Sequence, residues 1–161
     1  MTWTWTPRSW RGSGVRGEGL YLVDTSAWLF VLRRPPVTAL RDRLEELLSA
    51  DAVAVMGIVV LEILGGARTE EERRRLAERL RGLHHLPTPE GLWEEAGELA
   101  WRLRRRGVTV PFTDTLIATV AMAQGAVLLH ADQDFDLIAR HEPLRVESHV
   151  ETVRASQRGK S

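Results

Sequence analysis

Three acidic residues each stand alone in a stretch of chain with no other Asp, Glu, Lys or Arg. The residues and their stretches are Asp24 in 20–32, Glu62 in 52–67 and Asp114 in 107–131. An ionised carboxylate removed from water is costly unless a partner compensates its charge. A fourth acid, Asp132, directly follows the apolar run that ends at His130. We therefore predict that the four acids line one pocket.

Simpler explanations exist for some of these acids. Asp24 precedes a helical stretch and is a candidate N-cap, and Asp114 lies in the first turn of a helix, where a carboxylate is favourable. Glu62 lies too far inside its helix for capping. For Glu62 the alternative is a buried salt bridge to an arginine.

Four carboxylates in one pocket would repel one another, and a hard divalent cation removes that repulsion. The chain contains no cysteine, so thiolate zinc sites are excluded. Oxygen ligands favour Mg²⁺ or Mn²⁺, and one or two such ions activate water for attack on a phosphodiester. The acids alone therefore predict nuclease chemistry.

Short apolar strands alternate with helices along the chain. The expected strands are 20–23, 52–56, 83–86, 126–130 and 145–147. The expected helices are 25–32, 39–50, 58–67, 70–81, 90–106, 114–124 and 133–140. This alternation predicts a three-layer α/β/α domain with a mainly parallel sheet of four or five strands. Sites in such sheets form at the carboxyl ends of the strands.

The chain has 161 residues, of which 43% are hydrophobic, and its net charge is zero. This size fits one domain, expected at 20–150, between a flexible leader at 1–19 and a flexible tail at 151–161. No long apolar run and no signal peptide is found, so a cytoplasmic protein is expected.

Four segments together resemble the PIN-domain family and, in their compact spacing, its VapC-type toxins. They are residues 22–27 (Leu-Val-Asp-Thr-Ser-Ala), 61–62 (Leu-Glu), 112–118 (Phe-Thr-Asp-Thr-Leu-Ile-Ala) and 130–135 (His-Ala-Asp-Gln-Asp-Phe). The resemblance implies a PIN-like fold and an endoribonuclease that requires Mg²⁺ or Mn²⁺ and cleaves RNA of the tRNA or rRNA class. It also implies a homodimer inhibited by a VapB-type antitoxin. Asp24, Glu62, Asp114 and Asp132 match the family's catalytic and metal-binding acids, with Asp134 as an alternative to Asp132.

The chain departs from the family in two places. The first acid follows 23 residues, where the family has only a few, and initiation at Val15 would restore that distance. His130 stands where the family often has Thr or Ser. We expect His130, Ser26, Thr25 and Thr113 to support the acids.

Other features have two readings. Arg102, Arg104, Arg105 and Arg106 are candidate RNA contacts, but they also suit a solvated helix face with glutamate partners. Trp28, Trp93 and Trp101 indicate core or dimer interface. The function alternatives are a DNA-directed protein of the same fold and a non-catalytic binding protein. An aspartyl-phosphate enzyme is rejected because Ser26 stands where its second Asp belongs and the only lysine is Lys160.

Overall fold

The computed structural model describes residues 19–159. Within them five strands form one parallel sheet: β1 (Tyr21–Val23), β2 (Val53–Val55), β3 (His84–His85), β4 (Val127–His130) and β5 (Val146–Ser148). The helices there are α1 (Thr25–Leu32), α2 (Thr38–Ser49), α3 (Gly57–Gly65), α4 (Glu70–Arg81), α5 (Leu92–Arg105), α6 (Phe112–Gln124), α7 (Gln133–Ala139) and α8 (Val150–Arg158). The predicted α/β/α fold with a parallel sheet is confirmed. Apart from Gly19, the expected leader lies outside the described residues.

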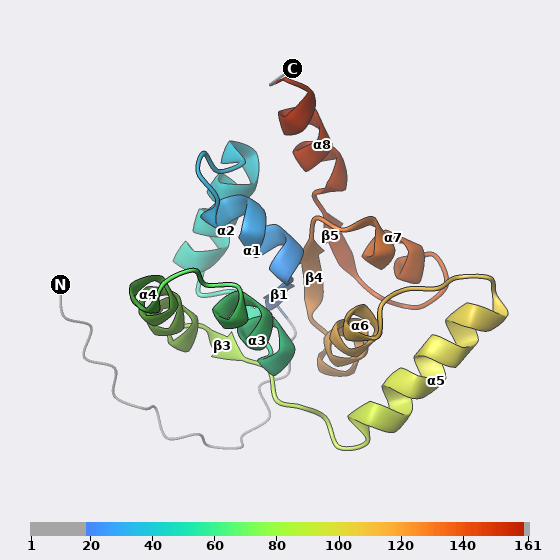
Figure 1. Cartoon of the computed structure of the whole chain (residues 1–161). Helices are drawn as coiled ribbons and strands as arrows, with labels where there is room; N and C mark the ends of the chain where they lie inside the picture. The colour runs from blue at the N-terminus through green and yellow to red at the C-terminus, as the bar shows by residue number, and fades with distance from the viewer. Residues whose placement is uncertain (1–18, 160–161) are drawn as a thin grey trace.

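The strand order β3-β2-β1-β4-β5 determines where a site can form. From β1 the chain runs outward through β2 to β3, then returns to place β4 on the other side of β1. In Figure 1, α1 to α4 lie to the left of the sheet centre and α5 to α7 to its right. The carboxyl ends of β1 and β4 therefore meet where the chain changes direction, which is where open α/β sheets bind ligands.

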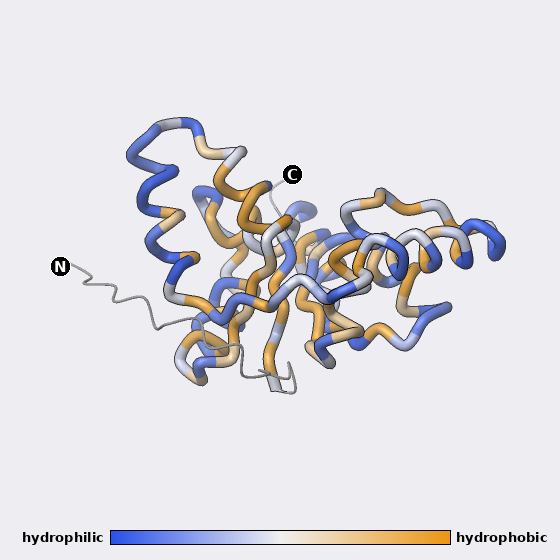
Figure 2. The backbone as a smooth tube through the Cα atoms, turned by 90° about the horizontal axis from the view of Figure 1, so that it is seen from below, coloured by the Kyte–Doolittle hydropathy of each residue, from blue (hydrophilic) through white to orange (hydrophobic). Residues whose placement is uncertain are grey.

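The three central strands are buried on both faces, as expected for a parallel sheet covered by helices. Leu22, Val23, Ala54, Val55, Leu128 and Leu129 have no exposed surface. Figure 2 shows the hydrophobic segments gathered towards the middle of the molecule. This packed sheet gives the residues that follow β1 and β4 a rigid base.

Helix α5 buries the stripe that its sequence predicts, made of Leu92, Ala96, Leu99 and Leu103. Trp28 lies in the core, but Trp93 and Trp101 are 70% and 60% exposed. The expectation of a core position is therefore wrong for both, because the four buried residues already fill the inward face of α5. A dimer interface stays a prediction for them.

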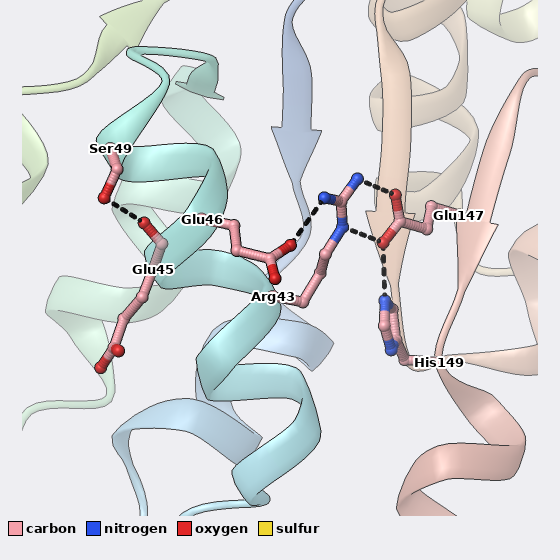
Figure 3. Close-up of polar contacts among 6 residues, drawn as sticks. All are labelled: Arg43, Glu45, Glu46, Ser49, Glu147 and His149. Atoms are coloured by element: carbon pink, nitrogen blue, oxygen red, sulfur yellow. Dashed lines mark hydrogen bonds and ion pairs between the residues drawn. The ribbon is translucent and has the colours of Figure 1, made fainter.

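The C-terminal region differs from the flexible tail expected from residue 151. Residues Val150–Arg158 form α8, with Val150 and Val153 buried. Nearby, Glu147 of β5 accepts two hydrogen bonds from Arg43 of α2, at 2.8 and 2.9 Å, and contacts His149 (Figure 3). None of the helices in 19–159 is long and apolar enough to cross a membrane.

Candidate metal centre

Asp24 lies at the carboxyl end of β1, beside the end of β4. Its backbone N–H donates to the Leu129 carbonyl at 2.9 Å, which continues the pairing of the two strands for one residue. Its side chain caps α1 by accepting the Ser26 N–H at 2.8 Å and is only 5% exposed. Burial raises the pKa of Asp24, although the hydrogen bonds from Ser26 oppose that rise. The N-cap interpretation is thus correct. The cap does not offset the whole effect of burial on this carboxylate, because its pKa stays raised.

Three further carboxylates gather beside the end of β4. One oxygen from each of Asp114, Asp132 and Asp134 lies within 4.8 Å of the other two. Asp132 caps α7 by accepting the Asp134 N–H at 3.0 Å, which places both acids at the start of that helix. Asp114 comes from the first turn of α6. The structure therefore brings Asp132 and Asp134 into the cluster together, where the sequence had treated them as alternatives.

Asp114 has the most unfavourable surroundings of these acids. Its Oδ2 atom is buried and accepts no hydrogen bond from the described residues. Burial, followed by the charges of Asp24, Asp132, Asp134 and Glu62, raises the pKa of Asp114 to about 7. A carboxylate without partners among like charges fits a site whose compensating charge is a cation.

Glu62 projects from α3 and accepts a hydrogen bond from the Thr25 hydroxyl. Among the described residues it forms no ion pair with an arginine, so the buried salt bridge considered from the sequence is not found. Its charge contributes to the raised pKa of Asp114. Glu62 therefore faces the other acids and has its position set by α1.

The donor atoms around this pocket suit a hard divalent cation. All are carboxylate oxygens, and the buried Asp114 Oδ2 offers an unused lone pair. Oxygen ligands of this kind prefer Mg²⁺, Mn²⁺ or Ca²⁺ over softer metals.

Comparison with known proteins places this arrangement in a family. The model of the PIN domain matches residues 21–141, which contain all five acids. The chain belongs to the PIN-domain family. It is 37% identical to ribonuclease VapC21 of Mycobacterium tuberculosis, over 74% of this chain and 86% of that protein. It is 35% identical to ribonuclease VapC11 of the same species, over 80% of this chain and 98% of that protein.

Solved structures share the fold of this PIN domain. A chain of VapBC2 from Rickettsia felis, determined with promoter DNA, aligns with a TM-score of 0.67 and 22% identity. The alignment covers 80% of this chain and 98% of that one. A chain of VapBC-1 from nontypeable Haemophilus influenzae aligns with a TM-score of 0.64 and 23% identity. That alignment covers 80% of this chain and 97% of the other.

Two side chains fix the PIN domain's backbone next to Asp132. The Ser26 hydroxyl accepts the Ala131 N–H at 3.0 Å, and His130 Nδ1 accepts the Asp132 N–H at 3.3 Å. His130 is fully buried, and burial lowers its pKa, which keeps the imidazole neutral and its Nδ1 free to accept. Ser26 and His130 thus fix two consecutive backbone N–H groups of the segment that carries Asp132.

Asp136 is a neighbour of the site that the sequence reasoning missed. One of its oxygens lies 3.5 Å from His130 Nε2, and the other accepts a hydrogen bond from Ser148 at 3.0 Å. The alternation of Asp132, Asp134 and Asp136 in the sequence was the available signal. Nothing in the sequence indicated that Ser148 of β5 would reach it.

The predicted start of one helix needs correction. The helix expected from Asp114 begins at Phe112, with Pro111 as its N-cap residue, so Thr113 lies inside the first turn of α6. Arg102 and Arg106 both bind Glu142, which is 8% exposed, at 2.9 and 3.2 Å. That pairing ties α5 to the segment after α7, and RNA contact by these two arginines stays a prediction. Arg104 and Arg105 are in no ion pair with the described residues.

Proposed function

We propose that this chain is a Mg²⁺- or Mn²⁺-dependent endoribonuclease and the toxin of a VapBC-type pair. The observation that carries the proposal is the cluster of Asp114, Asp132 and Asp134 around the unpartnered Asp114 oxygen, with Asp24 and Glu62 beside it. The names of the VapC relatives support RNA as the substrate. We assign metal binding and catalysis to Asp24, Glu62, Asp114 and Asp132, with Asp134 as a further ligand.

Each residue has a definable task in this proposal. When bound, the cation supplies an activated water and stabilises charge on the phosphate that is attacked. With a pKa raised to about 7, the Asp114 carboxyl is partly protonated at neutral pH in the cation-free pocket, and it must be ionised to bind a cation. Thr25 positions Glu62 through its hydroxyl, and Ser26 and His130 position the backbone before Asp132. The packed ends of β1 and β4 give these groups a rigid base.

The partners follow the same reasoning. Structures with this fold were determined as VapBC complexes, and we propose a VapB-type antitoxin for this chain. We also propose a homodimer, a substrate among the tRNA or rRNA class, and action in the cytoplasm, where such RNA is found.

The decisive experiment measures cleavage of total tRNA and rRNA by the full chain. We expect cleavage with Mg²⁺ or Mn²⁺ and none with a chelator. Asp114→Asn and Asp24→Asn should abolish cleavage and keep the circular dichroism spectrum of the wild type. Metal-independent cleavage, or full activity of both variants, would refute the proposal.

The same assay separates the alternatives. Single-stranded and duplex DNA serve as parallel substrates, and cleavage of DNA with intact RNA would identify a DNA-directed enzyme. Binding of Mn²⁺ without cleavage of any nucleic acid would identify a non-catalytic protein that retains the pocket.

A further inference from the structure

Two exposed aromatic rings lie at the junction of α5 and α6, each with an arginine over it. The guanidinium carbon of Arg105 is 5.9 Å from the Trp101 ring centroid, and that of Arg104 is 5.3 Å from the Phe112 centroid. Trp101 is 60% and Phe112 64% exposed. We call these four residues the aromatic-arginine patch.

The patch is not part of the packing of the domain. Helix α5 faces the core with another stripe, and Trp101, Arg104 and Arg105 share its outer face at helical spacing. Figure 1 shows α5 at the outer edge of the molecule, followed by the loop to α6. Aromatic rings and arginines gathered at one exposed place are typical of interaction sites.

The charge of the patch distinguishes it from the rest of α5. The helix begins with Glu94 and Glu95 and ends with its arginines. Arg102 and Arg106 bind Glu142, whereas Arg104 and Arg105 form no ion pair within residues 19–159 and each lies over an aromatic ring. A ring keeps the guanidinium plane oriented without neutralising its charge. The patch therefore offers positive charge and stacking surface at the same place.

The patch also lies close to the acids. Phe112 is the first residue of α6, and Asp114 belongs to the same turn, on the other side of the helix. A helix is roughly 10 Å across with its side chains, so ring and carboxylate are about one or two nucleotides apart.

We infer that the aromatic-arginine patch binds the single-stranded RNA segment next to the bond that is cut. Unpaired bases stack on Trp101 and Phe112, and their phosphates pair with Arg104 and Arg105. Duplex RNA fits poorly because its bases are already stacked on each other and do not expose their faces. The choice of RNA rests on the proposed function.

The test is a binding assay on the full chain in a chelator, so that binding is measured without cleavage. The probe is a labelled RNA of about ten nucleotides, alone or paired with its complement, followed by fluorescence anisotropy. Trp101→Ala with Phe112→Ala should weaken binding of the single strand by roughly 5- to 100-fold for each stacked base lost. Duplex binding should change by less than about twofold by the same reasoning.

Matched controls come from the same molecule. Trp93→Ala removes an equally exposed tryptophan from the acidic end of α5 and should leave the affinity unchanged. Arg104→Gln with Arg105→Gln should lower the slope of log affinity against log salt by about 1.4. Arg41→Gln with Arg154→Gln changes the net charge by the same amount but removes arginines that already pair with acids. This control should lower the salt slope by less than the patch variant does.

Three results would overturn the inference. They are an unchanged single-strand affinity in the Trp101 and Phe112 variant, an equal loss in Trp93→Ala, and a loss of dimer in sedimentation with unchanged RNA affinity. The last result would make the patch an interface between two copies.

The inference and the proposed function can fail separately. If the wild type cleaves RNA while the patch variants bind RNA normally, the inference is refuted and the proposed function is retained. If the wild type binds the single strand through the patch but does not cleave RNA, the proposed function is refuted and the inference about binding is retained.

Discussion

Two carboxylates close to the sheet, Asp114 and Glu147, have opposite surroundings. Glu147 receives two hydrogen bonds from the Arg43 guanidinium and one contact from His149 (Figure 3), and Arg43 lowers its pKa. Asp114 has a buried oxygen that receives no hydrogen bond from the described part of the chain, it has four neighbouring acids, and its pKa is raised to about 7. One carboxylate is therefore satisfied by the chain itself, and the other is not.

This difference distinguishes an ion pair that stabilises the fold from a pocket of acids that serves the reaction. The Arg43–Glu147 pair joins α2 to β5 and is complete without any other molecule. The acidic pocket carries a free-energy cost when its acids are ionised, which a bound cation would remove, as is common at functional sites. Changes at the first site should therefore affect stability, and changes at the second should affect activity.

The largest expected effect is the loss of cleavage in Asp114→Asn. Loss of a residue that merely orients a metal ligand lowers activity or metal affinity by 10- to 100-fold, so loss of a direct ligand should cost about 100-fold or more. The cation-free variant should be as stable as the wild type at pH 8 or more stable, because a neutral amide replaces a buried charge. Single-turnover cleavage and urea unfolding measure the two properties, and a variant that is active but unstable would reverse the comparison.

The next effect is a loss of stability in Arg43→Met. It leaves Glu147, which is 27% exposed, without its guanidinium partner, and we expect a loss of about 1 to 2 kcal/mol in the free energy of unfolding. Cleavage by the folded variant should be retained. Glu46→Gln is the matched control, because Glu46 contacts the same arginine from a more exposed position. An equal loss in the control would show that Glu147 is not the important partner.

The contributions of Asp114 and Glu147 to the stability of the fold should also change with pH in opposite directions. The folded-state pKa of Asp114 is raised from 3.8 to about 7, so its contribution to stability is fully present below pH 3.8 and is lost as pH rises through about 7. The pKa of Glu147 is lowered from 4.5, so its contribution is present above pH 4.5 and is lost as pH falls through the folded-state pKa.

Urea unfolding of cation-free protein across this range tests the contrast. Asp114→Asn should remove the decline of the free energy of unfolding towards neutral pH. Glu147→Gln should remove the decline of the same free energy in acid. Release of the Asp114 proton should also raise Mn²⁺ affinity about tenfold between roughly pH 6 and pH 8. An affinity independent of pH would show that Asp114 does not bind the ion.

The smallest effect is expected at an ion pair in open solvent. Arg73 donates to Glu70 on the surface of α4 at 2.6 Å, with both side chains about half exposed or more. Arg73→Gln should not change the unfolding midpoint measurably, because water competes with such a pair. A loss as large as that of Arg43→Met would mean that burial does not distinguish the two pairs.

Much of this molecule follows from patterns that a single sequence displays. The alternation of short apolar runs and amphipathic helices predicted the parallel sheet, and the buried stripe of α5 was read from its period. The isolation of Asp24, Glu62 and Asp114 pointed to a shared pocket because an uncompensated charge in an apolar stretch needs an explanation.

The remaining features depend on contacts between distant segments. Helix α8 has only Val150 and Val153 to bury, so its sequence looks like a polar tail until the end of β5 supplies a surface. The pairing of Arg102 and Arg106 with Glu142 could not be read from α5, which has glutamates of its own. Trp101 fits a helical period, but the period alone does not say which face is inward.

The strand order also bears on how the protein is made. Strands β1 and β4 are direct neighbours in the sheet although they come from opposite ends of the domain. A nascent chain that has emerged as far as α5 carries Asp24 and Glu62, yet it lacks Asp114, Asp132 and Asp134. Such a fragment has no pocket for a cation. The nuclease site is therefore not assembled during synthesis until nearly the whole domain has left the ribosome.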